Sequence, residues 1–157
     1  MTKDPVCGMT IDEMKGAAST TCQGKIGLFL AVSFLMHWGW ETAHGVAYVE
    51  TALPLATRVW HCLPMAGVDT LWTAGLVALA GRAGSIRVAA LVATVLGAAT
   101  AILIEWYALR NGRWTYNELM PLVPLVRVGW WPVLQMAILP PIAMTVTRRF
   151  SGRARSS

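Results

Sequence analysis

Long runs of apolar residues alternate with short polar segments along this chain of 157 residues. A helix rises about 1.5 Å per residue and the hydrocarbon core of a membrane is about 30 Å thick. Four runs are long enough to cross that core as helices, the last only barely: 26–49, 62–81, 86–107 and 130–146. The pattern predicts an all-α integral membrane protein with four transmembrane helices in one bundle.

The composition supports a membrane protein. Apolar residues make up 55% of the chain and charged residues 13%, and the mean hydropathy is +0.52. A soluble domain has roughly a quarter of its residues charged. A polar segment precedes the first run, so this run does not have the form of a signal peptide. We therefore divide the chain into an N-terminal cytoplasmic tail (1–25), a transmembrane domain (26–149) and a basic C-terminal tail (150–157).

Lysine and arginine residues are distributed unevenly between the two sides of such a bundle. With both termini in the cytoplasm, nine of the 13 basic residues lie inside and four lie outside, as the positive-inside rule requires. The sequence thus predicts a multi-pass protein of a bacterial inner membrane. The basic residues at 148–155 would contact the anionic inner leaflet, where each is worth about 1 kcal/mol. The lipid bilayer therefore explains the net charge of +5, and no nucleic acid partner is expected.

Ionisable and amide side chains interrupt the apolar runs at similar depths. His37, Glu41 and His44 occur at positions i, i+4 and i+7, so they share one face of the first helix. The other three helices place polar side chains in the same outer half of the membrane, namely Asp69, Glu105 and Gln135. An isolated carboxylate costs about 2.5–3.5 kcal/mol at the bilayer centre even on the mildest scale. We expect these side chains to face one another and to form a metal site or a proton relay.

Two plainer interpretations of this cluster remain open. Glu105 lies near a helix end and can snorkel to the interface. Glu41 can serve as packing alone, through hydrogen bonds to Asp69 or Gln135 that are worth about 0.6 kcal/mol each in membranes.

The segment between the third and fourth runs is rich in aromatic and hydrogen-bonding groups. It includes Arg113 and Tyr116, which we add to the polar cluster, and it is placed to cover the outer end of the bundle. The chain is similar here to small uncharacterised bacterial four-helix membrane proteins, through the motifs Trp40-Glu41-Thr42-Ala43-His44, Gly67-Val68-Asp69, Glu105-Trp106 and Gly112-Arg113-Trp114-Thr115-Tyr116. The resemblance implies the fold and the place of the site, and no particular chemistry.

Small residues and prolines predict how the last two helices pack. Ala93, Gly97 and Ala101 are spaced by four, which predicts a close contact between the third helix and a neighbour. Pro132, Pro140 and Pro141 lie inside the fourth run, and we expect them to kink or break that helix and to free backbone carbonyls.

The N-terminal tail carries the run Asp4-Pro5-Val6-Cys7-Gly8-Met9-Thr10-Ile11-Asp12. Cys7 and Met9 offer soft sulfur ligands of the kind that select Cu(I) or another thiophilic metal ion. The run resembles the start of the YHS domain, a small metal-associated module found beside copper and silver P-type ATPases. The resemblance ends before Ile26, so it implies an incomplete YHS-like tail. The alternative is that two sulfurs alone hold no metal.

These observations favour a membrane protein that handles a soft heavy-metal ion such as copper or silver, by binding, transport or resistance. Its expected metal ligands are Cys7 and Met9 in the tail, and His37, Glu41, His44 and Asp69 in the bundle. No phosphate loop, zinc-protease motif or serine nucleophile is present, so an enzyme is less favoured. Two alternatives remain: an enzyme that acts on a lipid-soluble substrate through the Glu, His and Asp side chains, and a structural accessory to a metal-transporting P-type ATPase. Four helices enclose only a small pore, so transport would favour a homo-oligomer.

Overall fold

The computed structural model describes the backbone of residues 18–153, and that part of the chain is helical without a β-strand. Cys7 and Met9 lie outside the described residues, so the predicted metal-binding tail is untested. The elements follow one another as α1 (Ala18–His44), η2 (Gly45–Ala47), α2 (Leu55–His61), α3 (Leu63–Ala80), η3 (Gly81–Ala83), α4 (Ile86–Arg110) and α5 (Trp130–Arg153).

Each of the four predicted runs corresponds to one long helix: α1, α3, α4 and α5. Two of the described helical segments are long and apolar enough to cross a membrane, Leu63–Ala83 and Ile86–Arg110. The helices α1 and α5 have 27 and 24 residues, but they are not as uniformly apolar. The helical fold is thus confirmed, and the ability to span is shown by length and composition for two segments.

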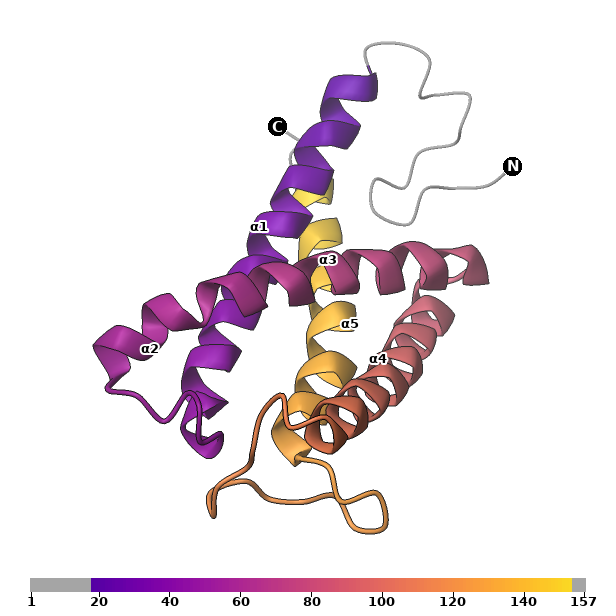
Figure 1. Ribbon diagram of the computed structural model, residues 1–157. Coiled ribbons are helices and arrows are strands. Elements are labelled where there is room, and N and C mark those ends of the chain that lie inside the picture. Colours follow the sequence, from indigo (N-terminus) through magenta and orange to yellow (C-terminus); the bar gives the residue numbers. More distant parts are fainter. Residues whose placement is uncertain (1–17, 154–157) are drawn as a thin grey trace.

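The helices α1 and α5 run side by side in opposite directions, and α3 crosses them at a steep angle (Figure 1). The start of α1 and the end of α5 lie at one end of the bundle, which we call the terminal end. The loop end is the opposite one, where α1 and α4 finish and α5 begins. The turn η3 joins α3 to α4, and from this turn the two helices diverge like the arms of a V (Figure 1). Gly84 takes a positive φ of 80° in this turn, which few other residues adopt without strain.

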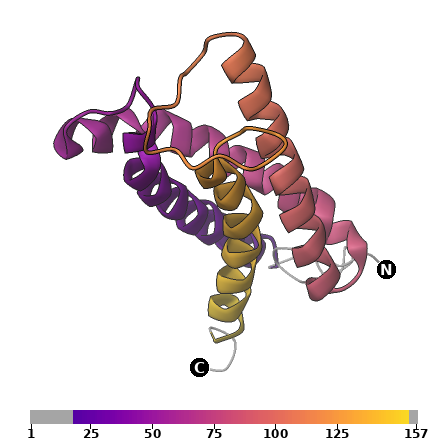
Figure 2. The ribbon, with the colours of Figure 1, turned by 90° about the horizontal axis from the view of Figure 1, so that it is seen from below.

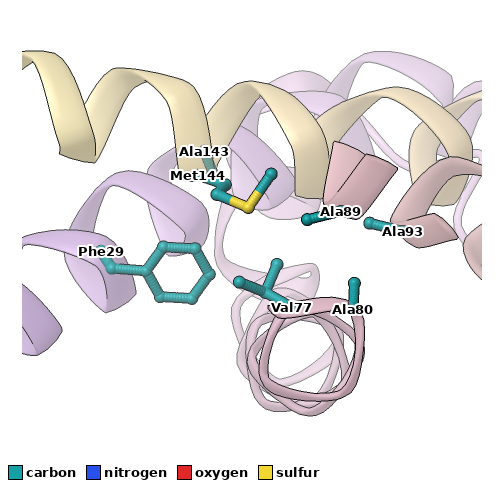
Figure 3. Packing of buried hydrophobic residues seen from close by; sticks show 7 residues of the cluster. All are labelled: Phe29, Val77, Ala80, Ala89, Ala93, Ala143 and Met144. Atoms are coloured by element: carbon teal, nitrogen blue, oxygen red, sulfur yellow. The ribbon is translucent and has the colours of Figure 1, made fainter. Parts of the chain in front are cut away.

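A tight apolar core fills the terminal end of the bundle (Figure 3). Its buried residues come from all four long helices: Phe29, Val77, Ala80, Ala89, Ala93, Ala143 and Met144. Small alanines bring the helices close together around the larger Phe29 and Met144 side chains. This core closes the terminal end, and the polar side chains that line a pocket lie toward the loop end.

The helices α4 and α5 approach each other closely at Gly97, where there is no side chain to separate their backbones. Ala93, Gly97 and Ala101 are buried on one stripe of α4, as the spacing predicted. A Cβ added at Gly97 would lie only 1.8 Å from the carbonyl oxygen of Met136 in α5. Gly97 therefore allows the two backbones to touch.

The two internal prolines do not break α5, so a break at these positions was wrongly predicted, whereas the predicted loss of a backbone donor is present. The helix continues from Trp130 to Arg153 through Pro140 and Pro141. Pro140 has no N–H for the carbonyl oxygen of Met136, four residues earlier. Gly97 of α4 approaches this same oxygen. The close contact with α4 therefore lies at the turn of α5 that lacks its usual backbone hydrogen bond.

The long helices expose more large apolar side chains than the helices of a soluble protein do. Leu71 and Leu91 are 71% and 64% exposed, although they are large apolar residues. The polar residues His37 and Gln135, by contrast, are buried in the middle of the bundle. Soluble proteins expose single apolar residues, but they rarely bury polar groups while their long helices present apolar faces outward.

Replacing Gly97 by alanine should destabilise the bundle, because the new Cβ would collide with the backbone of α5. Overpacking of this kind costs about 1–3 kcal/mol, so the Tm of the purified protein in detergent should fall. Gly75→Ala is the matched control, since a Cβ at Gly75 in α3 meets no atom within 4 Å. An equal Tm for the two variants would contradict the close α4–α5 contact.

Candidate functional site

A pocket of about 300 Å³ lies at the loop end of the bundle. Much of its wall is apolar, with Met65, Val68 and Trp72 from α3, Ala101 and Ile104 from α4, and Met136 from α5. Polar side chains from the four long helices reach the same pocket, namely Glu41, Asp69, Glu105 and Gln135. The structure therefore brings together the four side chains that the sequence placed at one depth.

Two carboxyl groups and one amide form the centre of the site. The Glu41 carboxyl group hydrogen-bonds the side chains of Asp69 and Gln135. Gln135 Nε2 donates to Asp69 Oδ2 over 2.9 Å. Two carboxyl groups can hydrogen-bond each other only if a proton lies between them. At least one of the Glu41 and Asp69 carboxyl groups therefore holds a proton in this arrangement.

His37 contacts this centre through the amide of Gln135. It is fully buried, with Nδ1 3.0 Å from Gln135 Nε2 and Nε2 2.8 Å from Thr73 Oγ1. An amide nitrogen can only donate, so Nδ1 accepts and the proton of the neutral ring is on Nε2, which donates to Thr73. His37 Nδ1 lies 3.9 Å from Asp69 Oδ2. Both ring nitrogens have partners inside the protein, so neither is available to a metal ion in this arrangement.

His44 takes no part in the central group. Its Nδ1 lies 2.7 Å from the carbonyl oxygen of Trp40, one turn earlier in α1, and its ring packs edge-on against Tyr48 with centroids 5.6 Å apart. Of the four metal ligands predicted in the bundle, only Glu41 and Asp69 line the pocket. Between residues 18 and 153, the described side chains include no group of three His, Cys, Asp or Glu residues that could hold a metal ion.

Glu105 forms a second polar group at the outer edge of the pocket. The carboxylate is buried and accepts hydrogen bonds from Tyr48 Oη and Trp114 Nε1, each over 3.0 Å, and a short one from Tyr116 Oη. Burial, together with the bond to Glu105, raises the pKa of the Tyr116 hydroxyl, so this group stays a neutral donor. The interpretation that Glu105 snorkels to the interface is wrong, because three donors hold it inside.

The segment after α4 is docked on the end of α1 rather than extended into solvent (Figure 2). The backbone N–H of Val49 donates to the Thr115 carbonyl over 2.9 Å, and that of Asn117 donates to the Ala47 carbonyl over 3.0 Å. Tyr116 Oη also accepts from the N–H of Gly129, over 2.8 Å. Arg113, the other residue added to the cluster, is exposed at the rim of the pocket. This segment, 111–129, thus forms an outer cover over Glu105.

The structure adds pocket residues that were not assigned from the sequence. Cys62, Met65 and Met136 bring three sulfur atoms to the lining. The spacing of Met65 and Asp69 by four residues is the signal that could have found Met65, because it places both on one face of α3. Tyr48 gives no such signal, because it meets Glu105 only through folding, across 57 residues.

A buried arginine fixes the chain after α1. Arg58 Nε donates to the carbonyl oxygen of Thr42 over 2.8 Å, and Nη1 donates to that of Leu53 over 3.1 Å. A cation that binds the last carbonyls of a helix satisfies them and complements the helix dipole. Arg58 thereby holds the end of α1, next to Glu41 and Tyr48, in place.

No protein-family model, curated protein or solved structure matches this chain. The resemblance of the tail to a YHS domain, and that of the bundle to other four-helix membrane proteins, therefore stay predictions.

Replacing Glu105 by glutamine should release the segment 111–129, because the three donors lose their charged acceptor. A hydrogen bond to a charged group contributes about 1.5–3 kcal/mol. Hydrogen exchange of this segment should then become faster by about tenfold or more, followed by mass spectrometry. Glu118→Gln removes an exposed acid from the same segment and should leave exchange unchanged. Equal protection in both variants would show that Glu105 does not hold the segment.

Proposed function

We propose that this chain is a four-helix, multi-pass membrane protein that binds a membrane-soluble amphiphile in the pocket and exchanges a proton with it. The observation that carries this proposal is the hydrogen-bonded pair of carboxyl groups, Glu41 and Asp69, in a pocket with mostly apolar walls. This observation favours the alternative of a lipid-soluble substrate over metal handling.

The exposure of large apolar side chains on the long helices supports the membrane setting. Water would strongly favour the reverse arrangement, whereas lipid tails tolerate the exposed Leu71, Leu91 and Leu103. Polar groups inside a membrane face one another, as those around Gln135 do. We propose that α1 and α5 cross the membrane with α3 and α4, and that the nine-to-four bias of basic residues keeps both termini in the cytoplasm.

The shape of the pocket supports a small amphiphile as its ligand. Ligand sites commonly have volumes of about 300–1,000 Å³, apolar walls and a few placed polar groups. This pocket matches the lower end of that range. Its apolar wall suits the body of a ligand that dissolves in lipid, and its carboxyl pair suits a polar end.

The carboxyl pair gives the site an acid and a base at once. Whichever carboxyl group holds the shared proton can donate it to the ligand, and the other can accept one. Two neighbouring carboxyl groups that share a proton act in this way in general acid–base catalysis. The same chemistry serves proton-coupled binding if no bond in the ligand breaks. Gln135 and His37 then keep Asp69 in place.

A second candidate function is the handling of a soft metal ion, which would be the substrate. The sulfur atoms of Cys62, Met65 and Met136 line the same pocket as the carboxyl pair. Sulfur ligands select Cu(I) and related ions. The resemblance of residues 1–25 to a YHS domain points to the same ions. In this case the protein acts alone or beside a metal-transporting P-type ATPase.

The proposal predicts that the protein, purified in a mild detergent, retains a lipid-soluble molecule that mass spectrometry of the organic extract detects. Glu41→Gln and Asp69→Asn should each lower retention by about tenfold, equivalent to about 1.4 kcal/mol of binding energy, because the polar end loses its partner. Glu118→Gln is the matched control, since this exposed acid does not line the pocket.

Equal retention by all variants would contradict an amphiphile site at the carboxyl pair. Metal analysis of the same samples separates the second candidate. A metal ion that is bound by the parent and lost in Cys62→Ser and Met65→Leu would favour metal handling instead. Loss only after deletion of residues 1–24 would assign the metal to the tail.

A further inference from the structure

We infer that Trp72 limits the length of the ligand, by closing the narrow end of a side entrance between α3 and α4. The inference rests on the proposed function, since it names how a lipid-soluble ligand enters the pocket and which side chain selects it by size.

The V between α3 and α4 gives the entrance its shape. The two helices meet at η3 and separate toward the loop end (Figure 1). The pocket is lined by the first half of α3 and by the second half of α4, which are the widely separated parts of the V. The pocket lining therefore comes from the parts of α3 and α4 that lie away from η3, and the two helices approach each other toward η3.

The mouth of the V faces the surroundings of the bundle. Val68 and Ile104, on opposite arms, both line the pocket, yet they are 57% and 41% exposed. An apolar residue that lines a pocket and is also half exposed marks the edge of that pocket. In a membrane these side chains contact lipid, so the ligand passes between them from the lipid phase.

Trp72 bridges the two arms at the inner limit of the mouth. Its Nε1 donates to Thr100 Oγ1 of α4 over 3.3 Å. Thr100 uses its own hydroxyl proton on the carbonyl oxygens of Leu96 and Gly97, so its oxygen is free to accept from the indole. The indole lines the pocket and is 46% exposed. The indole thus connects α3 to α4 at the edge of the pocket and is not part of the buried apolar core.

The helices are closed to ligands beyond Trp72. Val77 and Ala80 of α3 pack with Ala89 and Ala93 of α4 in the apolar core of the terminal end (Figure 3). Within the described chain, a shorter side chain at position 72 would therefore enlarge the pocket only by the volume that the indole now fills.

Cys62 provides a reporter for this idea, because its buried thiol lines the pocket. The full chain with Cys7→Ser and Cys22→Ser keeps it as the one thiol. This parent is reconstituted into phosphatidylcholine vesicles and treated with N-ethyl-, N-hexyl- and N-dodecylmaleimide at about pH 8.5, near the ordinary pKa of a thiol. Mass spectrometry of the intact protein measures the rate of labelling.

In the parent, we expect the labelling rate to fall by about tenfold or more from the shortest to the longest probe. An apolar pocket discriminates between ligands that differ in methylene groups by factors of this size. Trp72→Ala should remove most of this fall, and Trp72→Leu, which keeps an apolar side chain, should remove part of it. Leu71→Ala is the matched control, because Leu71 is exposed on the same helix and does not line the pocket. It should behave as the parent does.

The same fall in rate for the parent and for both Trp72 variants would overturn the role of Trp72 while leaving the proposed function in place. Two other results would contradict the proposed function itself. One is an unreactive Cys62 with every lipid-soluble probe. The other is faster labelling by a charged maleimide that cannot enter lipid, since that would show a pocket open to water instead of to the membrane.

Discussion

The hydrogen bond between the carboxyl groups of Glu41 and Asp69 is the interaction on which the rest of the pocket depends. A carboxylate buried without a partner costs several kcal/mol, whereas a proton held by one carboxyl group of the pair removes one charge, and Gln135 donates to Asp69. Because α1, α3 and α5 supply these three side chains, the three helices have to meet at one depth. The position of His37, and of Thr73 behind it, follows from the same requirement.

The helix α4 is held by close packing against α5 rather than by this hydrogen-bond network. Buried small residues recur every four positions along α4, and Gly97 brings its backbone onto that of α5. Glu105 continues the same stripe, so the contact that fixes α4 also places this carboxylate beneath Tyr48, Trp114 and Tyr116. The close contact between α4 and α5 therefore fixes the side of the pocket that Ala101, Glu105 and Met136 line.

The sequence predicted the helices and the depth of the polar residues because apolar length and helical spacing are local properties. Glu41, Asp69 and Gln135 do meet. Helical spacing, however, shows only which residues share a face of a helix, and it does not show which side chains they contact. His37 was expected to offer a ligand, and it is instead enclosed by Gln135 and Thr73. Contacts of Glu105 with residues in loops, and the unbroken helix at Pro140, depend on packing between distant segments and had no local signal. The tail with Cys7 and Met9 stays a prediction.

The shared proton is tested most directly by infrared spectroscopy of the reconstituted protein at neutral pH. We expect a carbonyl stretching band of a protonated carboxyl group that shifts in D₂O and disappears in the double variant Glu41→Gln, Asp69→Asn. Glu118→Gln, an exposed acid outside the pocket, should keep the band. Absence of the band in the unaltered protein, or its persistence in the double variant, would contradict a proton shared between these two side chains.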